Sequence, residues 1–271
     1  MKKLSARRRH PLAALVVLLI ALAATGGLYA TFAPTGKAQA DETSAAQSLA
    51  VEEGQKLYRV GCASCHGTGG QGSSDGPSLV GVGAAAVDFQ VSTGRMPLQQ
   101  QGAQAPKKPN IYTQKEIDQL AAYVASLGPG PAVPEESQYD PAGGDVGRGG
   151  DLFRNNCAQC HNFTGKGGAL TDGKYAPNID GVDPKHMYEA MVTGPQNMPA
   201  FPDGVLTPEN KQDIIAYLDE VGGDEAESPG GFSLGGLGPV SEGLFAWVFG
   251  LGALIVLTIW IAARTAKARK S

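Results

Sequence analysis

One five-residue pattern occurs twice in the sequence and limits what the chain can become: Cys62-Ala-Ser-Cys65-His66 and Cys157-Ala-Gln-Cys160-His161. Two thiols three residues apart can each add to a vinyl group of one haem, and the histidine that follows is then held against the iron. The two patterns use all 4 cysteines, so none is left for a disulfide. The sequence therefore predicts two covalently bound haem c groups, with His66 and His161 as proximal iron ligands.

Two other kinds of site also use paired cysteines. Four cysteines can hold a structural zinc ion, and a Cys-X-X-Cys pair can be a thioredoxin-like redox motif. Zinc does not require a histidine directly after each pair. A redox motif is expected within alternating strands and helices, and the sequence shows no such alternation. Both alternatives explain less of the pattern than covalent haem does.

The composition favours small, loop-rich domains. With 271 residues the chain has room for two small domains, since a domain usually has about 100 to 200 residues. Glycine (38) and proline (18) are abundant, and only 7% of the residues are aromatic. Such a chain has few side chains for a large core, and a buried haem in each domain would supply the missing apolar mass.

Charge divides the chain into basic ends and an acidic middle. Nine of the 22 basic residues lie in 2–9 and 264–270, so residues 10–263 carry 13 bases and 26 acids. This balance excludes a nucleic-acid-binding protein. It fits either a solvated acidic surface or docking to a positively charged redox partner.

Apolar segments near both ends predict membrane attachment. Residues 12–33 carry no charge and follow a basic stretch, which fits either a transmembrane anchor or an export signal cleaved after Ala38-Gln39-Ala40. Residues 244–263 are also uncharged, have Trp247 and Trp260 near their ends, and precede a basic tail at 264–271. We predict a multi-pass cell-membrane protein with cytoplasmic termini and extracytoplasmic haem domains.

The first haem domain is predicted at 49–127, after residues 1–48 that hold the basic end and anchor or signal. A short helix over 51–61 leads into the haem motif. Met96 lies in a loop before Pro97 and is the sole methionine of the domain, so we predict it as the distal iron ligand. Thr113 and Glu116 form a capping box that opens an amphipathic helix, expected to pack across the first. Residues 128–146 are rich in Pro and Gly and are interpreted as a linker, partly stiff and partly flexible.

The second domain, 147–221, repeats the first. Gly54, Tyr58, Pro77, Thr93 and Tyr123 have counterparts at Gly149, Phe153, Pro177, Thr193 and Tyr217, which indicates duplication. This alignment predicts Met198 as the second distal ligand, although His186, Met187 and Met191 are competitors. A second linker is predicted at 222–243. The predicted fold is mainly α, with two tandem class I c-type cytochrome domains and transmembrane helices at both ends.

Three longer motifs carry a family resemblance: Val-Ser-Thr-Gly-Arg-Met-Pro at 91–97, His-Asn-Phe-Thr-Gly-Lys-Gly-Gly-Ala at 161–169 and Thr-Gly-Pro-Gln-Asn-Met-Pro at 193–199. With the two domains and the C-terminal anchor, they resemble the dihaem cytochrome c subunit of the actinobacterial cytochrome bcc complex. The resemblance implies a subunit of a proton-translocating menaquinol:cytochrome c reductase that works with a Rieske iron-sulfur subunit and a cytochrome b subunit. It also implies electron delivery to the copper entry site of a haem-copper oxidase.

A haem with His and Met on its axis has no open position for substrate, so we expect single-electron transfer and no substrate chemistry in this chain. Three alternatives remain: the dihaem subunit of a cbb-type oxidase, a free-standing membrane-anchored electron carrier, and a dihaem peroxidase. The C-terminal anchor argues against the first, and the two distal methionines argue against the last.

Overall fold

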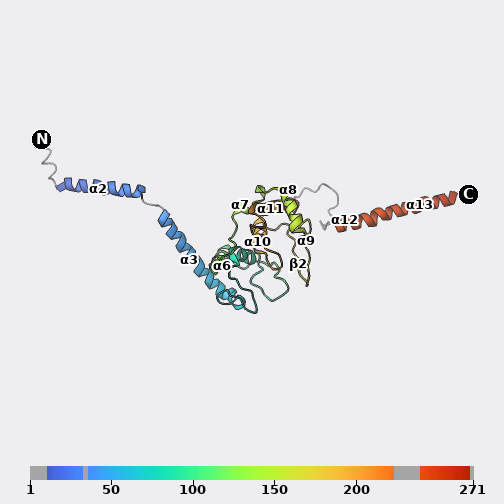
Figure 1. Cartoon of the computed structure of the whole chain (residues 1–271), viewed down its shortest axis with the longest axis horizontal. Coiled ribbons are helices and arrows are strands. Elements are labelled where there is room, and N and C mark those ends of the chain that lie inside the picture. The colour runs from blue at the N-terminus through green and yellow to red at the C-terminus, as the bar shows by residue number, and fades with distance from the viewer. Residues whose placement is uncertain (1–10, 33–35, 223–238, 269–271) are drawn as a thin grey trace, which may run out of the picture. The chain divides into compact units, whose positions relative to one another are not determined.

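The computed structural model describes residues 11–32, 36–222 and 239–268 (Figure 1). The chain divides into two compact units, Met1–Leu49 and Ala50–Ser271. The fold is mainly helical, as predicted. In chain order the elements are α2 (Pro11–Phe32), α3 (Gly36–Gly61), α4 (Ala63–His66), α5 (Gly83–Ser92), α6 (Gln114–Ser126), α7 (Glu136–Tyr139), the 3-10 helix η1 (Pro141–Gly143), α8 (Val146–Asn156), α9 (Ala158–His161), β1 (Gly168–Ala169), β2 (Tyr175–Ala176), α10 (Pro184–Thr193), α11 (Pro208–Gly222), α12 (Pro239–Phe245), the π-helix η3 (Ala246–Leu251) and α13 (Gly252–Ala268).

Residues 50–131 form what we call the first lobe. Its core combines the end of α3 with α5 and α6, and the rings of Tyr58 and Tyr123 lie 5.0 Å apart between their centroids. The capping box of Thr113 and Glu116 is present, and α6 buries Ile117 and other members of its apolar stripe. The predicted second helix of this lobe is therefore confirmed, and it packs on the first. Helix α3 is longer than the predicted 51–61, since it begins at Gly36.

Residues 132–222 form the second lobe, which has the same plan. The rings of Phe153 and Tyr217 pack with centroids 5.6 Å apart, as Tyr58 and Tyr123 do in the first lobe. Thr207 accepts a hydrogen bond from the backbone N–H of Asn210 at 3.3 Å, which satisfies one N–H group at the start of α11. One feature was not predicted from the sequence: β1 and β2 pair antiparallel, with Gly168 opposite Ala176.

The repeated glycines mark where the helices of each lobe cross. A Cβ atom on Gly54 would lie 1.9 Å from the carbonyl oxygen of Gln119, and one on Gly149 would lie 1.9 Å from that of Asp213. Any side chain would force the two backbones apart. Gly54 and Gly149 recur in the sequence because each lobe needs a helix crossing this close.

Residues 128–146 are packed rather than free. The N–H of Ala85 donates to the carbonyl of Pro131 at 3.1 Å. Helix α7 and η1 lie against α11, where the side-chain amide of Gln212 donates to the carbonyls of Ser137 and Asp140 at 2.9 and 3.0 Å. Helical turns in this segment thus contact α11, and its role as a linker stays a prediction. Of the predicted linker at 222–243, residues 223–238 lie outside the described residues.

Two helices are long and apolar enough to cross a membrane. They cover Leu12–Tyr29 and Ser241–Arg264, with mean hydropathy 2.3 and 2.4. Most of their large apolar side chains, such as Leu19, Trp247 and Ile259, are more than half exposed in the protein alone. Such surface is stable in lipid rather than in water. The segments are those predicted from the sequence as candidate anchors.

We expect Gly149→Ala to destabilise the second lobe by at least about 2 kcal/mol, because the added methyl group meets a backbone carbonyl that cannot move cheaply. Gly204→Ala is the control, since a Cβ there has no atom within 4 Å. Thermal unfolding followed by circular dichroism measures both variants. Equal melting temperatures for the two would contradict the close crossing.

Candidate functional site

Each Cys-X-X-Cys-His segment folds as a short helical turn. The N–H groups of Cys65 and His66 donate to the carbonyl of Cys62 at 3.2 and 3.0 Å. The corresponding bonds of Cys160 and His161 to Cys157 are 3.1 and 2.9 Å. In each pair the first thiol is half-buried and the second is exposed, and all four thiols are free. The same local fold is thus built twice, once in α4 and once in α9.

Both histidines are held by a proline carbonyl. The Nδ1 atom of His66 lies 2.8 Å from the carbonyl oxygen of Pro77, and that of His161 lies 3.1 Å from the oxygen of Pro177. A carbonyl only accepts, so Nδ1 must carry the proton, and the lone pair of a neutral ring is then on Nε2. This is the second contact typical of a metal-binding histidine. The sequence showed that the two prolines recur but not that they hold the histidines.

The backbone after each histidine approaches it closely. The N–H of Gly72 donates to the carbonyl of His66 at 2.8 Å, and Gly167 does the same for His161 at 2.8 Å. A Cβ on Gly76 would lie 3.1 Å from Nδ1 of His66. The glycines therefore allow a loop to fold back over the histidine and bring the proline carbonyl into reach.

The two methionines follow α5 and α10 and face the lobe cores. Met96 and Cys62 both pack, half-buried, against the core of the first lobe, and Met198 and Cys157 pack in the same way on the second. The N–H of Met96 donates to the carbonyl of Gln90 at 2.9 Å. In each lobe the predicted methionine and the first cysteine of the haem motif thus pack on one core, and ligation by these methionines stays a prediction.

The three competitors for the second distal position all lie in α10. The Nε2 atom of His186, in α10, lies 2.9 Å from the hydroxyl oxygen of Ser92 in the first lobe. Met191 is buried in the core of the second lobe, and Met187 packs against it. His186 is thus engaged with the first lobe, whereas Met187 and Met198 pack against the same core, and the choice of Met198 stays a prediction.

Lys211 is a residue near this site that sequence reasoning missed. Its side chain is fully buried in α11. Its ammonium donates to the carboxylate of Asp203 at 2.6 Å and to the carbonyl of Leu206 at 2.7 Å, and it lies 5.5 Å from the centre of the Tyr188 ring. Lys211 therefore anchors the segment that connects Met198 to α11. A lysine in a helix carries no pattern that would distinguish it from an exposed one.

Burial shifts the pKa of three groups of the site. Burial, and next the neighbouring thiol, raises the pKa of Cys62 and of Cys157 to about 11, so both thiols are protonated at neutral pH. Burial lowers the pKa of His161 although the bond to Pro177 opposes the shift, so its ring is neutral. Vinyl-reactive thiols, an imidazole with a free Nε2 and a nearby thioether form a donor set that fits haem c. The first cysteines of the two pairs, Cys62 and Cys157, pack on different cores, so the two pairs do not form one zinc site.

Family models match both lobes. The model for "Cytochrome c" matches residues 51–128, and the model for "Cytochrome C oxidase, cbb3-type, subunit III" matches residues 144–218. The "Cytochrome bc1 complex cytochrome c subunit" of Mycobacterium tuberculosis is 50% identical over 96% of this chain and 93% of its own length. The protein of the same name from Corynebacterium efficiens is 48% identical over 97% and 94%. The "Cbb3-type cytochrome c oxidase subunit FixP" of Bradyrhizobium diazoefficiens is 26% identical over 73% and 70%.

We expect Lys211→Met to lower the free energy of unfolding of the second lobe by about 1–3 kcal/mol, because the carbonyl of Leu206 is left buried without a donor. Lys56→Met is the control, since Lys56 pairs only with exposed glutamates on its own helix and such pairs contribute little. Chemical denaturation gives both values. A loss no larger than that of the control would show that Lys211 does not anchor this segment.

Proposed function

The chain belongs to the family of cytochrome c subunits of the cytochrome bc1 complex, a quinol:cytochrome c oxidoreductase, and on this premise we propose a specific route for its electrons. Single electrons pass from a Rieske iron-sulfur protein, through two haem c groups in this chain, to the copper entry site of a haem-copper oxidase. The quinol is menaquinol, and the complex translocates protons. The observation that carries the proposal is the doubled site, in which each Cys-X-X-Cys-His turn has its histidine Nδ1 bonded to a proline carbonyl.

Each residue of the site has a proposed role. Cys62 and Cys65 in the first lobe, and Cys157 and Cys160 in the second, attach haem through thioether bonds. His66 and His161 present Nε2 to the iron, and the prolines keep each ring in the right tautomer and orientation. Met96 and Met198 are the distal ligands; a thioether raises the reduction potential relative to a second histidine. Bound haem supplies the one-electron couple.

The six-coordinate arrangement restricts the chemistry. A haem held by His66 and Met96, or by His161 and Met198, would have no open position for a substrate or peroxide. The catalytic steps of quinol oxidation and oxygen reduction then belong to partner subunits, and this chain contributes transfer alone.

We further propose that residues 49–127 and 147–221 are two tandem class I cytochrome c domains on the extracytoplasmic side, and that both termini are cytoplasmic. Two apolar helices and the basic residues beside them support this orientation. The second domain precedes the C-terminal helix in the chain, and on that ground we assign it to the Rieske side and the first domain to the oxidase. Cytochrome b is the remaining partner.

A cbb-type oxidase subunit is the second candidate, favoured by the family match of residues 144–218 and by the FixP relative. The longer and closer similarity to the bc1 subunits favours the first proposal. A free-standing membrane carrier is the third candidate, and the haems that accompany the protein distinguish all three.

Capture of the tagged chain from membranes in mild detergent tests the partners. We expect b-type and a-type haem bands beside the c-type band in the reduced-minus-oxidised spectrum, since a quinol-oxidising complex joined to its oxidase contains all three. An untagged strain is the control. A c-type band alone would favour the free-standing carrier, and b-type and c-type bands with high-spin b haem but no a-type band would favour the cbb-type oxidase.

The haem content tests the site. We expect two covalent haems per chain by the pyridine haemochrome assay, and one in the double variant Cys157→Ser with Cys160→Ser, because each pair attaches one group. The matching variant of Cys62 and Cys65 should also retain one. Protein mass under denaturing conditions checks that the haem is covalently attached. A single haem in the unaltered chain would contradict the two-haem proposal.

A further inference from the structure

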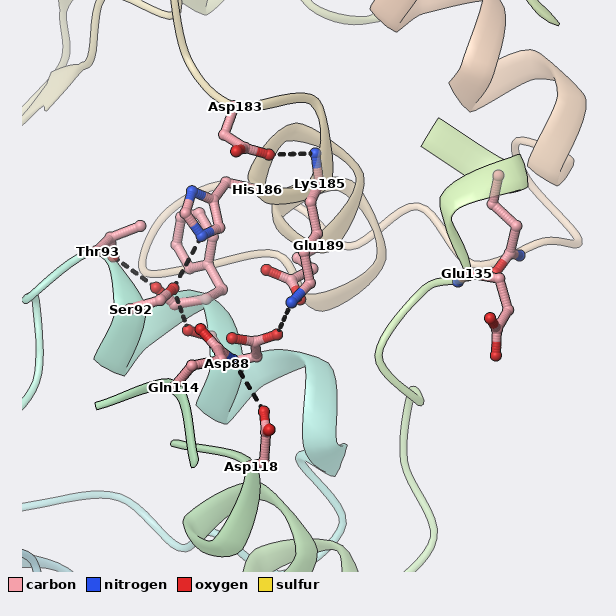
Figure 2. Close-up of polar contacts among 12 residues, drawn as sticks. Asp88, Ser92, Thr93, Gln114, Asp118, Glu135, Asp183, Lys185, His186 and Glu189 are labelled. Atoms are coloured by element: carbon pink, nitrogen blue, oxygen red, sulfur yellow. Dashed lines mark hydrogen bonds and ion pairs between the residues drawn. The ribbon is translucent and has the colours of Figure 1, made fainter. Parts of the chain in front are cut away.

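The two lobes meet along α5 and α10, and the contact is unusually polar (Figure 2). The ammonium of Lys185 in α10 forms an ion pair with the carboxylate of Asp88 in α5. One turn further, the hydroxyl of Ser92 and the ring of His186 are joined at 2.9 Å. Beyond them, Gln104 bonds both backbone groups of Tyr175, at 2.7 and 2.9 Å. Figure 2 shows the side chains of both helices directed into this contact.

The carboxylate of the ion pair is buried and the lysine is partly buried. Asp88 is 2% exposed, and the side chain of Lys185 is 24% exposed. One carboxylate oxygen of Asp88 bonds Lys185, while the other has no hydrogen-bond partner. A buried carboxylate is strongly unfavourable without a cation. Asp88 therefore depends on Lys185, which comes from the other lobe.

Other titratable groups surround this pair. Glu189 is fully buried one turn after Lys185. Burial, and next the charge of Asp88, raises its pKa to about 9, so Glu189 is neutral at physiological pH. Asp183 caps α10 by accepting from the N–H of Lys185 at 2.8 Å. Tyr139 from α7, His186 from α10 and Lys107 from the first lobe are further titratable groups near the pair.

Each haem motif belongs to one lobe, so the relative orientation of the lobes sets the separation of the two haems. We propose that Asp88 and Lys185 are positioning residues: their ion pair fixes the two lobes in one orientation and thereby sets the rate at which an electron passes between the haems. This inference rests on the proposed function, since it requires a haem in each lobe. A buried ion pair suits such a role because it is satisfied in one arrangement and costly in others.

The experiment uses the full chain with both haems, in detergent. Lys185→Met removes the cation, and Asp88→Asn removes the carboxylate while leaving Lys185 free to reach water. Pulsed electron paramagnetic resonance gives the separation of the two ferric haems, and pulse radiolysis gives the rate of electron exchange between them. For Lys185→Met we expect a broader range of separations and a rate lower by at least about tenfold, because one charge is left buried and unpaired. Asp88→Asn should also broaden the range of haem separations and lower the rate of electron exchange.

A matched control separates positioning from general stability. Arg148 in α8 pairs with Asp213 in α11, a carboxylate as buried as Asp88, but both residues lie in the second lobe. Arg148→Met should lower the melting temperature and leave the haem separation and the rate unchanged. Lys185→Arg should leave the haem separation and the electron-exchange rate as in the unaltered chain, since arginine can also pair with Asp88. Asp88→Asn keeps the test valid if Lys185→Met does not fold.

The outcomes are distinct. Unaltered separation and rate in Lys185→Met or Asp88→Asn, with two haems present, would overturn the positioning role and leave the proposed function intact. A single haem in the unaltered chain would instead overturn the proposed function.

Discussion

The hydrogen bond from each histidine Nδ1 to a proline carbonyl is the contact on which the rest of each lobe depends. It requires the loop after the histidine to fold back, which the glycines at 72 and 167 allow. It leaves the lone pair of Nε2 free, so the ring can serve as a metal ligand without rearranging. The helix crossing at Gly54 or Gly149 then places the aromatic pair beside the same core. Local turn, loop and core are thus linked through one short bond.

Sequence patterns predicted those parts of the structure that local rules decide. The helix that begins after Thr113 has a capping box and a buried stripe, both of which are readable over a few residues. The apolar end segments and the duplication were also readable, and family membership followed from long motifs. Helix α3 was predicted too short because residues 36–50 lack the apolar periodicity that marks a packed helix.

Several features that sequence reasoning missed depend on tertiary contacts rather than on a local pattern. Pro77 and Pro177 accept from histidines through backbone carbonyls, which any residue possesses. Lys211 is buried only because Asp203 and Leu206 lie around it. Asp88 and Lys185 are 97 positions apart in the sequence, and no pattern in either helix predicts that they pair. Burial of charge is a property of the tertiary structure, so one sequence alone does not reveal it.

The duplicated sequence indicates that the lobes arose as copies, yet each lobe contributes different residues to the contact between them. In the alignment that pairs Thr93 with Thr193, Asp88 corresponds to Tyr188 and Lys185 to Ala85. The contact is therefore heterologous: neither lobe could replace the other in it, and two first lobes or two second lobes would lack the matching charge. Duplication supplied two equivalent modules, and the divergence of α5 and α10 gave them a fixed order. Because the two lobes are not interchangeable, an electron relay built from them has a defined direction in space.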